Sequence, residues 1–318
     1  MSKTQTNESD KNTNKDDMTN EEDLLKHYEK ANKIAYSIRQ DAKKLIMPGA
    51  STIDIAESLE KMIFDAQAKP AFPVNISINE IAAHATPEAS STLLIGEKDL
   101  VKIDLGVHIN GCIADTAFTV DLSEEHGKLV EASEKALDEA IASIRPGKKT
   151  GEIGQIIQKT ITSFGFKPIE NLTGHMLQPY TLHAGPEIPN IAVSGGYEFK
   201  EGDFFAIEPF ASTGSGRVHD TDQIEIFQVM KLTNTRLRTS KQLLSYLIEN
   251  YLTLPFAQRW ISGKFQSHLI LHASLRDLMN NSAIQPFPIL SDEKGSYVSQ
   301  SEVTIVIEKD GARVLTKA

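Results

Sequence analysis

An internal repeat constrains the fold of this 318-residue chain more than any other feature of its sequence. A Pro-Gly pair with a helix-like segment after it, Pro48 to Ile55, recurs 98 residues later as Pro146 to Ile153. Lys69-Pro70 recurs at the same offset, and His84 to Glu88 recurs 99 residues later as His183 to Glu187. Because these short matches keep their order and nearly their spacing, they indicate two similar structural units in one chain.

Each copy of the repeat ends in an apolar run that finishes on a carboxylate. Asp99 to Asp104 ends the first copy, and Asp203 to Glu208 ends the second. Each copy is therefore predicted to run helix, turn, helix, histidine-containing segment and strand. Two such αβ halves, related by a pseudo-twofold axis, would bring the histidines and carboxylates of both copies together. We expect an α+β fold in which the halves enclose a common site.

The segment Val101 to Val120 is predicted to form a β-hairpin. Alternating residues flank Asn110-Gly111, the strongest short turn signal because both residues tolerate a positive φ. With this pair as the turn, position 104 faces 117 and position 106 faces 115, so Asp104 and Asp115 lie diagonally on one face. Two carboxylates this close repel each other unless a cation lies between them. The alternative is a solvated face on which both aspartates are ordinary surface charges.

Three further residues could complete a site at these aspartates. Glu208 lies in a strand predicted over Phe204 to Phe210, where an unpaired carboxylate is costly, so it needs either a metal or a salt-bridge partner. Glu302 precedes a β-branched strand, Val303 to Ile307, and could equally be a solvated residue at a strand edge. His175 follows a glycine and could supply an imidazole ligand or be an ordinary structural histidine.

The remaining segments define the expected organisation of the chain. Residues 1–20 have too few apolar groups to offset the entropy of ordering, so we predict a disordered N-terminal tail. A catalytic domain over 21–318 is expected to begin with an amphipathic helix that ends near Met47. Beyond the repeat, the periodicity of leucines predicts an inserted helical subdomain over about 228–288.

Composition and charge exclude several classes of protein. No apolar run is long enough for a membrane span, and no stretch near Met1 is typical of a signal peptide, so we expect a cytoplasmic protein. The single cysteine, Cys112, excludes an internal disulfide and a cysteine-rich zinc site. The formal net charge of -10 argues against nucleic-acid binding, because affinity for phosphates comes mainly from Lys and Arg.

Seven short motifs, in order along the chain from about Glu21 to the C-terminus, resemble the successive site motifs of type 2 methionine aminopeptidases. They are Ala82-Ala-His84, Lys102-Ile-Asp104-Leu-Gly106, Ile113-Ala-Asp115-Thr-Ala-Phe118, Asn171-Leu-Thr-Gly-His175, His183-Ala-Gly185, Ala206-Ile-Glu208-Pro-Phe210 and Gln300-Ser-Glu302-Val-Thr304. The predicted helical insertion before the last glutamate distinguishes type 2 enzymes from type 1. The tail lacks the long basic and acidic blocks of eukaryotic members, so the chain resembles an archaeal form.

The resemblance implies the pita-bread fold, an α+β architecture that the internal repeat supports independently. It also implies two divalent metal ions per chain, with the ligands Asp104, Asp115, His175, Glu208 and Glu302. Asp104 would bind one ion, and His175 and Glu208 the other. Asp115 and Glu302 would bridge the two. Four carboxylates and one imidazole suit cobalt(II), manganese(II) or iron(II) better than a metal that prefers thiolates.

By the same resemblance, the chain would remove the initiator methionine from nascent proteins by hydrolysis, with a water activated by the two metal ions. Glu208 would move the proton. His84 and His183, the equivalent positions of the repeat, would bind the substrate amide and stabilise the tetrahedral intermediate. The alternative for both histidines is a structural hydrogen bond.

The resemblance also places three apolar side chains around the substrate methionine: Phe72, Leu182 and Phe287. Phe227 stands where some members of the family have a histidine, a difference that would change the selectivity of the pocket. The expected partners are the N-termini of nascent polypeptides near the ribosome. We expect a monomer that binds neither nucleic acid nor a membrane.

Two other functions compete with this interpretation. One is another enzyme of the same fold, such as an Xaa-Pro peptidase, although such enzymes commonly have an additional N-terminal domain and here the repeat begins at Pro48. The other is a non-catalytic relative that binds protein or RNA. Such relatives lose metal ligands, whereas all five candidate ligands are present in this chain.

Overall fold

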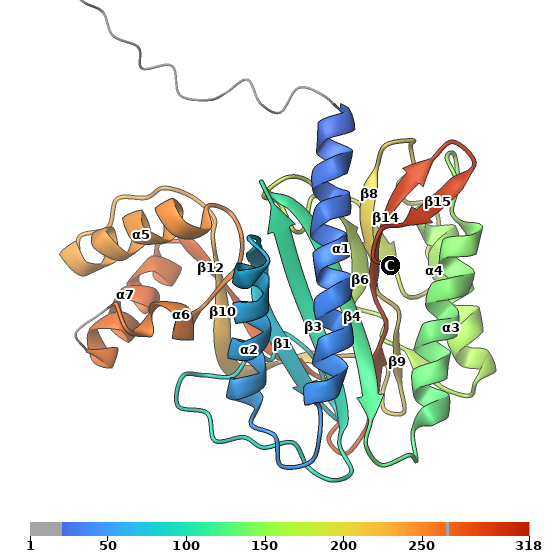
Figure 1. The fold of residues 1–318 in the computed structure, drawn as a ribbon, viewed down its shortest axis with the longest axis horizontal. Coiled ribbons are helices and arrows are strands. Elements are labelled where there is room, and N and C mark those ends of the chain that lie inside the picture. The colour runs from blue at the N-terminus through green and yellow to red at the C-terminus, as the bar shows by residue number, and fades with distance from the viewer. Residues whose placement is uncertain (1–20, 265–266, 318) are drawn as a thin grey trace, which may run out of the picture.

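The computed structural model describes residues 21–264 and 267–317, which form two αβ halves and a helical projection (Figure 1). In the first half, helices α1 (Glu21–Leu45) and α2 (Thr52–Asp65) lie on one face of a three-stranded antiparallel sheet. Its strands, in spatial order, are β1 (Lys69–Ile78), β3 (Leu100–Ile109) and β4 (Cys112–Asp121). The tail predicted over residues 1–20 lies outside the described residues.

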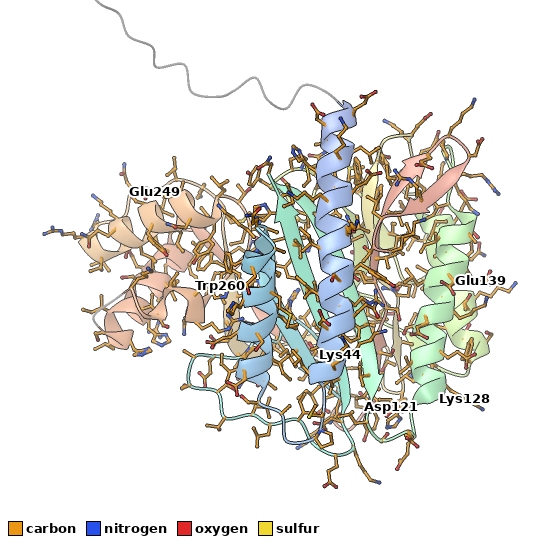
Figure 2. All side chains as sticks on the ribbon, in the orientation of Figure 1. Lys44, Asp121, Lys128, Glu139, Glu249 and Trp260 are labelled. Atoms are coloured by element: carbon orange, nitrogen blue, oxygen red, sulfur yellow. The ribbon has the colours of Figure 1, made fainter. Side chains whose placement is uncertain are left out.

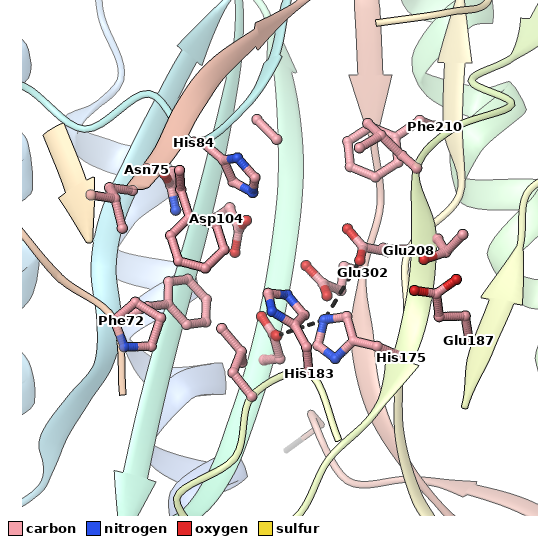
Figure 3. Close-up of a pocket in the computed structure, with 18 of the residues that line it drawn as sticks. Phe72, Asn75, His84, Asp104, His175, His183, Glu187, Glu208, Phe210 and Glu302 are labelled. Carbon is pink, nitrogen blue, oxygen red and sulfur yellow. Dashed lines mark ion pairs between the residues drawn. The ribbon is translucent and has the colours of Figure 1, made fainter. Parts of the chain in front are cut away.

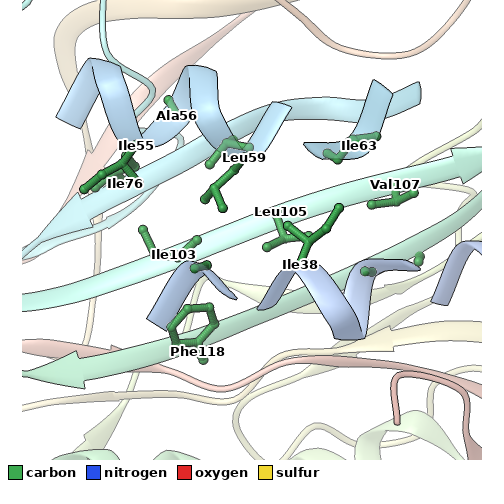
Figure 4. Packing of buried hydrophobic residues seen from close by; sticks show 14 of the residues in the cluster. Ile38, Ile55, Ala56, Leu59, Ile63, Ile76, Ile103, Leu105, Val107 and Phe118 are labelled. Atoms are coloured by element: carbon green, nitrogen blue, oxygen red, sulfur yellow. The ribbon is translucent and has the colours of Figure 1, made fainter. Parts of the chain in front are cut away.

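An apolar core joins these two helices to the sheet. Buried side chains recur at every third or fourth position of both helices and contact apolar side chains of the strands, among them Ile38, Leu59, Ile103, Leu105 and Phe118 (Figure 4). Burial of each such large side chain stabilises the fold by ~1.5–3 kcal/mol relative to exposure. Since strand side chains alternate between faces, the residues between these core positions point to the other side of the sheet.

Strands β3 and β4 form the predicted hairpin. The turn residues Asn110-Gly111 have positive φ values of 50° and 87°. Asp104 pairs with Ala117, and Gly106 pairs with Asp115. The predicted register, and with it the shared face of the two aspartates, is therefore confirmed.

The second half repeats this arrangement with shorter strands. Helices α3 (Gly127–Ser143) and α4 (Thr150–Ser163) pack on a five-stranded sheet of spatial order β15-β14-β8-β6-β7. Its strands are β6 (Thr173–Met176), β7 (Glu187–Pro189), β8 (Phe204–Ile207), β14 (Val303–Glu308) and β15 (Gly311–Val314). The turns before α2 and α4 both place a glycine at positive φ, 80° at Gly49 and 86° at Gly147. The repeat found in the sequence is thus a repeat of the fold.

The two halves meet along β4 and β14. Ala117 and Glu302 exchange backbone hydrogen bonds of 3.3 and 3.0 Å. The Thr304 hydroxyl accepts from the Asp115 N–H at 2.8 Å and donates to the Asp115 carbonyl at 3.0 Å. A small sheet of β5 (Lys167–Pro168), β9 (Phe210–Ser212) and β13 (Val298–Gln300) continues this junction. The sheet faces that the helices leave uncovered therefore border a common space.

The helical projection follows β10 (His219–Val229) and lies at the left of Figure 1. Its helices are α5 (Arg238–Tyr251), α6 (Gln258–Ser262) and α7 (His268–Asn280). They enclose a hydrophobic cluster of their own, which includes Leu243, Leu247, Phe256 and Leu275. The projection adjoins a sheet of spatial order β11-β10-β12-β2, completed by β2 (Ile81–Ala83), β11 (Phe256–Ala257) and β12 (Ile284–Ser291). The predicted insertion therefore contains helices. That these helices form a separate subdomain stays a prediction.

Two segments differ from the sequence predictions. The strand predicted over Phe204 to Phe210 is interrupted at Glu208-Pro209, and its two ends belong to different sheets as β8 and β9. Proline has no N–H to donate to a neighbouring strand, which explains the interruption. The helical segment predicted to end near residue 288 ends earlier, because 284–291 form β12 beside β10.

The outer faces of the helices are polar. Exposed charged residues there include Lys44 on α1, Lys128 and Glu139 on α3 and Glu249 on α5 (Figure 2). Within the described ranges, no helix combines the length and the apolar character needed to cross a membrane.

Candidate active site

The space between the two sheets is a cavity of about 510 Å³ (Figure 3). Both halves and the region of the helical projection contribute to its lining. All the site residues predicted from the sequence lie on it: Phe72, His84, Asp104, Asp115, His175, Leu182, His183, Glu208, Phe287 and Glu302. The fold therefore brings into one cavity residues that are spread over most of the chain.

Asp115, His175 and Glu302 form the tightest group in this cavity. One side-chain N or O atom from each lies within 4.8 Å of the others, and none of the three residues is more than 6% exposed. Nε2 of His175 lies 3.6 Å from Oδ2 of Asp115 and 3.6 Å from Oε1 of Glu208. Three of the four predicted carboxylate ligands thus lie close to the imidazole of His175.

Asp104 faces this group from β3. Its Oδ1 atom is buried and has no hydrogen-bond partner. Burial raises the pKa of Asp104 to about 7. A buried carboxylate oxygen without a donor is costly, so this atom requires a cation or a proton.

Burial also disfavours the ionised forms of Asp115, Glu208 and Glu302. Burial, followed by the charge of Asp104, raises the pKa of Asp115 well above its usual value. Burial, followed by the charge of Asp115, raises the pKa of Glu208 and of Glu302. A divalent cation among them would favour all four ionised forms. This set of hard oxygen donors with one imidazole therefore fits a divalent metal ion.

Two polar residues next to the predicted metal ligands, Gln300 and Asn75, had no role assigned from the sequence. Gln300 is 1% exposed, and its Nε2 donates to Oε2 of Glu208 at 3.4 Å and to Oε2 of Glu302 at 3.3 Å, which orients both carboxylates. Its position two residues before Glu302 was the available signal, because such residues share a face of an extended segment. Asn75 pairs with Asp104 across β1 and β3 and also lines the cavity.

His84 and His183 lie beside the ring of Phe287, at 5.5 and 6.1 Å between ring centroids. His183 also lies edge-on to His175 at 4.5 Å. Burial lowers the pKa of His84. His183 lines the cavity, and loss of hydration there, followed by the charge of His84, lowers its pKa to about 4. Both imidazoles are therefore neutral at neutral pH.

The hydrogen bond of His84 decides which of its ring nitrogens holds the proton. Nδ1 lies 3.2 Å from the carbonyl oxygen of Pro288 in β12. A carbonyl oxygen only accepts, so Nδ1 must donate to it. In the neutral ring Nε2 is then left with its lone pair, and it can accept a hydrogen bond from a bound molecule.

Phe72 and Leu182 are buried apolar residues of the lining, at 5% and 6% exposure. Phe72 pairs with Gly106, and its ring occupies the space that a side chain at 106 would need. Phe227 does not line the cavity: it is 3% exposed and stacks on Phe256 at 6.0 Å, whereas Ile226 faces the cavity. Successive strand residues point to opposite faces, so Ile226 contacts the pocket and Phe227 does not. The expected effect of Phe227 on the selectivity of the pocket therefore has no direct contact behind it.

Comparison with known proteins shows the family of this chain. Residues 26–233 match the model of metallopeptidase family M24. Methionine aminopeptidases of archaea are similar over nearly the whole chain. That of Methanothermobacter thermautotrophicus is 40% identical over 297 residues, which are 92% of this chain and 99% of the relative.

Solved structures show the same fold. A thermophilic Arx1 matches with a TM-score of 0.82 at 18% identity, over 92% of this chain and 90% of its own. The methionine aminopeptidase of Thermotoga maritima matches with a TM-score of 0.68 at 24% identity, over 93% of this chain and 97% of its own. Identities this low show the fold alone. The predicted α+β pita-bread fold is confirmed.

The family match spans both copies of the repeat, and the archaeal relatives are similar over 92% of the chain or nearly so. The archaeal relatives therefore favour a methionine aminopeptidase over the two alternative functions considered from the sequence, an Xaa-Pro peptidase and a non-catalytic binding protein. The chain therefore belongs to metallopeptidase family M24, as a methionyl aminopeptidase of the archaeal-like type.

Proposed function

We propose that this methionyl aminopeptidase binds two divalent ions and uses them to remove the initiator methionine from nascent polypeptides. Its metal-dependent removal of an N-terminal methionine follows from the family and the relatives. The number of buried ligands supports a pair of ions. The five proposed ligands, four carboxyl groups and one imidazole, all line one cavity, and they are more than a single catalytic ion with an open position uses.

The ligands divide between the two ions as follows. Asp104 binds one ion, and His175 with Glu208 binds the other. Asp115 and Glu302 would be shared by both ions. The 3.6 Å contacts of His175 with Asp115 and Glu208, and the separate position of Asp104 on β3, support this division. Cobalt(II), manganese(II) and iron(II) suit these ligands.

Bound together, two such ions supply a nucleophilic water at neutral pH and polarise the scissile carbonyl. Glu208, beside His175, accepts the proton of the attacking water and passes it to the leaving amine. Gln300 holds Glu208 and Glu302 in orientation through its two hydrogen bonds. The ionised form of Glu208 depends on the bound cations, because burial raises its pKa in their absence.

The two histidines act on the substrate. His84 accepts a hydrogen bond from the N–H of the scissile amide, since its Nδ1 proton is already donated to Pro288 and its Nε2 lone pair is available. His183 donates to the oxygen on which negative charge develops. A donor held in place before the reaction stabilises that charge without reorganisation.

Phe72, Leu182 and Phe287 bind the methionine side chain. They are three of the apolar residues of the cavity, which Phe210 and Ile226 also line beside its charged and polar groups. Aromatic and aliphatic contacts suit a flexible thioether side chain. We expect the substrates to be N-termini of nascent polypeptides near the ribosome, and the enzyme to be a monomer without affinity for nucleic acid.

Metal titration combined with peptide hydrolysis tests this proposal. The enzyme is stripped with a chelator, refilled stepwise with manganese(II), cobalt(II) or iron(II), and assayed on a Met-Ala peptide and an Ala-Pro peptide. We expect up to two bound ions per chain and cleavage of the Met-Ala peptide alone. Full activity at one bound ion, with no second binding step, would contradict the dinuclear mechanism.

A further inference from the structure

A buried ion pair joins the helical projection to the first αβ half. Arg259 in α6 and Glu60 in α2 have side chains only 3% and 8% exposed. Nη1 of Arg259 donates to Oε2 of Glu60 at 2.9 Å, and Nη2 donates to Oε1. The indole Nε1 of Trp260 adds a hydrogen bond of 2.8 Å to Oε2 of Glu60, and Figure 2 shows Trp260 beside α2.

This pair continues toward the cavity through Thr86. Nη2 of Arg259 donates to the Thr86 hydroxyl at 3.2 Å, and this hydroxyl donates to the Val74 carbonyl at 2.8 Å. The Val74 N–H in turn donates to Oε1 of Glu60 at 3.2 Å. We call Glu60, Val74, Thr86, Arg259 and Trp260 the Arg259 network. It ties α2, β1 and α6 to the segment two residues after His84.

His84 is in a conformation that its surroundings must impose. Its φ is +63°, a left-handed value that is rare for residues other than glycine and persists only where neighbouring contacts determine it. On one side, Pro288 of β12 accepts from its Nδ1. On the other side, the Ala85 carbonyl accepts from the Ile76 N–H at 2.6 Å, and Thr86 belongs to the Arg259 network.

A buried ion pair is a weak source of stability, because the cost of removing both charges from water offsets most of their attraction. The geometry of this pair indicates another use. Arg259 forms a fork that contacts Glu60 with both Nη atoms and Thr86 with one of them, a pattern that lysine cannot reproduce.

We propose that Arg259 is a positioning residue that acts through Thr86 to hold His84 in place against the substrate. The helical projection then has a role in turnover, although no residue of its helices α5, α6 and α7 is among the described residues that line the cavity. This inference rests on the proposed role of His84 in substrate binding.

Four variants test the inference with full-length, metal-loaded enzyme on a Met-Ala peptide. Thr86→Val keeps the shape of the side chain and removes the hydroxyl, whereas Thr86→Ser keeps the hydroxyl. Arg259→Lys keeps the charge and removes the fork. Arg313→Lys is the matched control, because Arg313 pairs with Glu29 and Glu308 at a partly exposed site away from the cavity.

We expect Thr86→Val and Arg259→Lys to lower kcat by about 10- to 100-fold, because a shift of about 1 Å in a catalytic group has effects of this size. KM should change by less than about 3-fold and bound metal not at all, since the change affects the transition state rather than initial binding. Thr86→Ser and Arg313→Lys should stay within about 3-fold of the wild type. If Arg259→Lys does not fold, Thr86→Val alone decides, because it leaves the ion pair intact.

A double-mutant cycle identifies the residue through which the network acts. In the His84→Ala background, Thr86→Val should lower kcat by less than about 2-fold further, because the group that it positions is gone. A wild-type kcat for Thr86→Val, or an undiminished loss in the His84→Ala background, would overturn the inference while leaving the proposed function intact. If His84→Ala alone has normal turnover, the proposed role of His84 fails, and the positioning role fails with it.

Discussion

Substitution of Gly106 by alanine tests whether the ring of Phe72 shapes the methionine pocket. An added Cβ would lie 2.3 Å from Cε1 and 2.5 Å from Cδ1 of this ring, whereas carbon atoms in contact lie about 3.5–4.0 Å apart. The ring must therefore retreat by roughly 1–1.5 Å. Gly106 does not have a positive φ, so alanine adds no backbone strain and the effect comes from the methyl group.

The size of the effect follows from this displacement. Overpacking of a buried site costs about 1–3 kcal/mol of folding stability. A misplacement of about 1 Å in a substrate-contacting group costs up to about 10²-fold in rate. We therefore expect Gly106→Ala to lower kcat/KM on a Met-Ala peptide by about 10- to 100-fold, with a raised KM and a lowered melting temperature.

Two further measurements separate this cause from others. Bound metal must be measured, because Gly106 lies two residues from the proposed ligand Asp104 on the same strand. The second measurement is the melting temperature of a double variant that also carries Phe72→Leu. This substitution replaces the ring by a shorter side chain and should restore part of the lost stability. Unchanged kcat/KM and melting temperature in Gly106→Ala would refute the reasoning, as would a double variant no more stable than the single one.

Four other outcomes are expected. Exhaustive chelation should abolish peptide hydrolysis and added manganese(II) should restore it; hydrolysis that persists without metal contradicts a metal mechanism. Asp115→Asn should abolish turnover but leave the metal-free protein folded in thermal unfolding, because it removes charge repulsion from a buried group; near-normal activity would remove this aspartate from the site. His183→Ala should lower kcat by about 10²- to 10³-fold with unchanged bound metal, and loss of an ion would instead make His183 a ligand. Burial, followed by the charge of Glu88, raises the pKa of Glu225 to about 7. As the pH rises, the unfolded chain loses this proton at a lower pH than the folded chain, so the free energy of unfolding falls between about pH 4.5 and 7. Glu225→Gln should therefore raise the melting temperature relative to the wild type at pH 8 and not at pH 4, and a difference independent of pH would show that Glu225 does not titrate in this range.

The sequence alone predicts features that depend on local rules. The register of β3 and β4 follows from the turn at Asn110-Gly111 and from the alternation of strand side chains, so the shared face of Asp104 and Asp115 was predictable. The repeat predicts two similar halves, because recurring turns and apolar patterns specify recurring elements. The resemblance to a known family supplies the remaining candidate residues, and all of them line the cavity.

Tertiary structure decides features that depend on which distant segments meet. The break at Pro209 separates two sheets, and the burial of Phe227 in the projection leaves the cavity to Ile226. The spacing of Gln300 and Glu302 suggests a shared face, but nothing local indicates that Gln300 also contacts Glu208. Glu60 and Arg259 are 199 residues apart, and neither has a local signal of their pairing. A hydrogen bond or an ion pair forms only when packing brings both groups together and excludes water from them, and sequence spacing does not determine that packing.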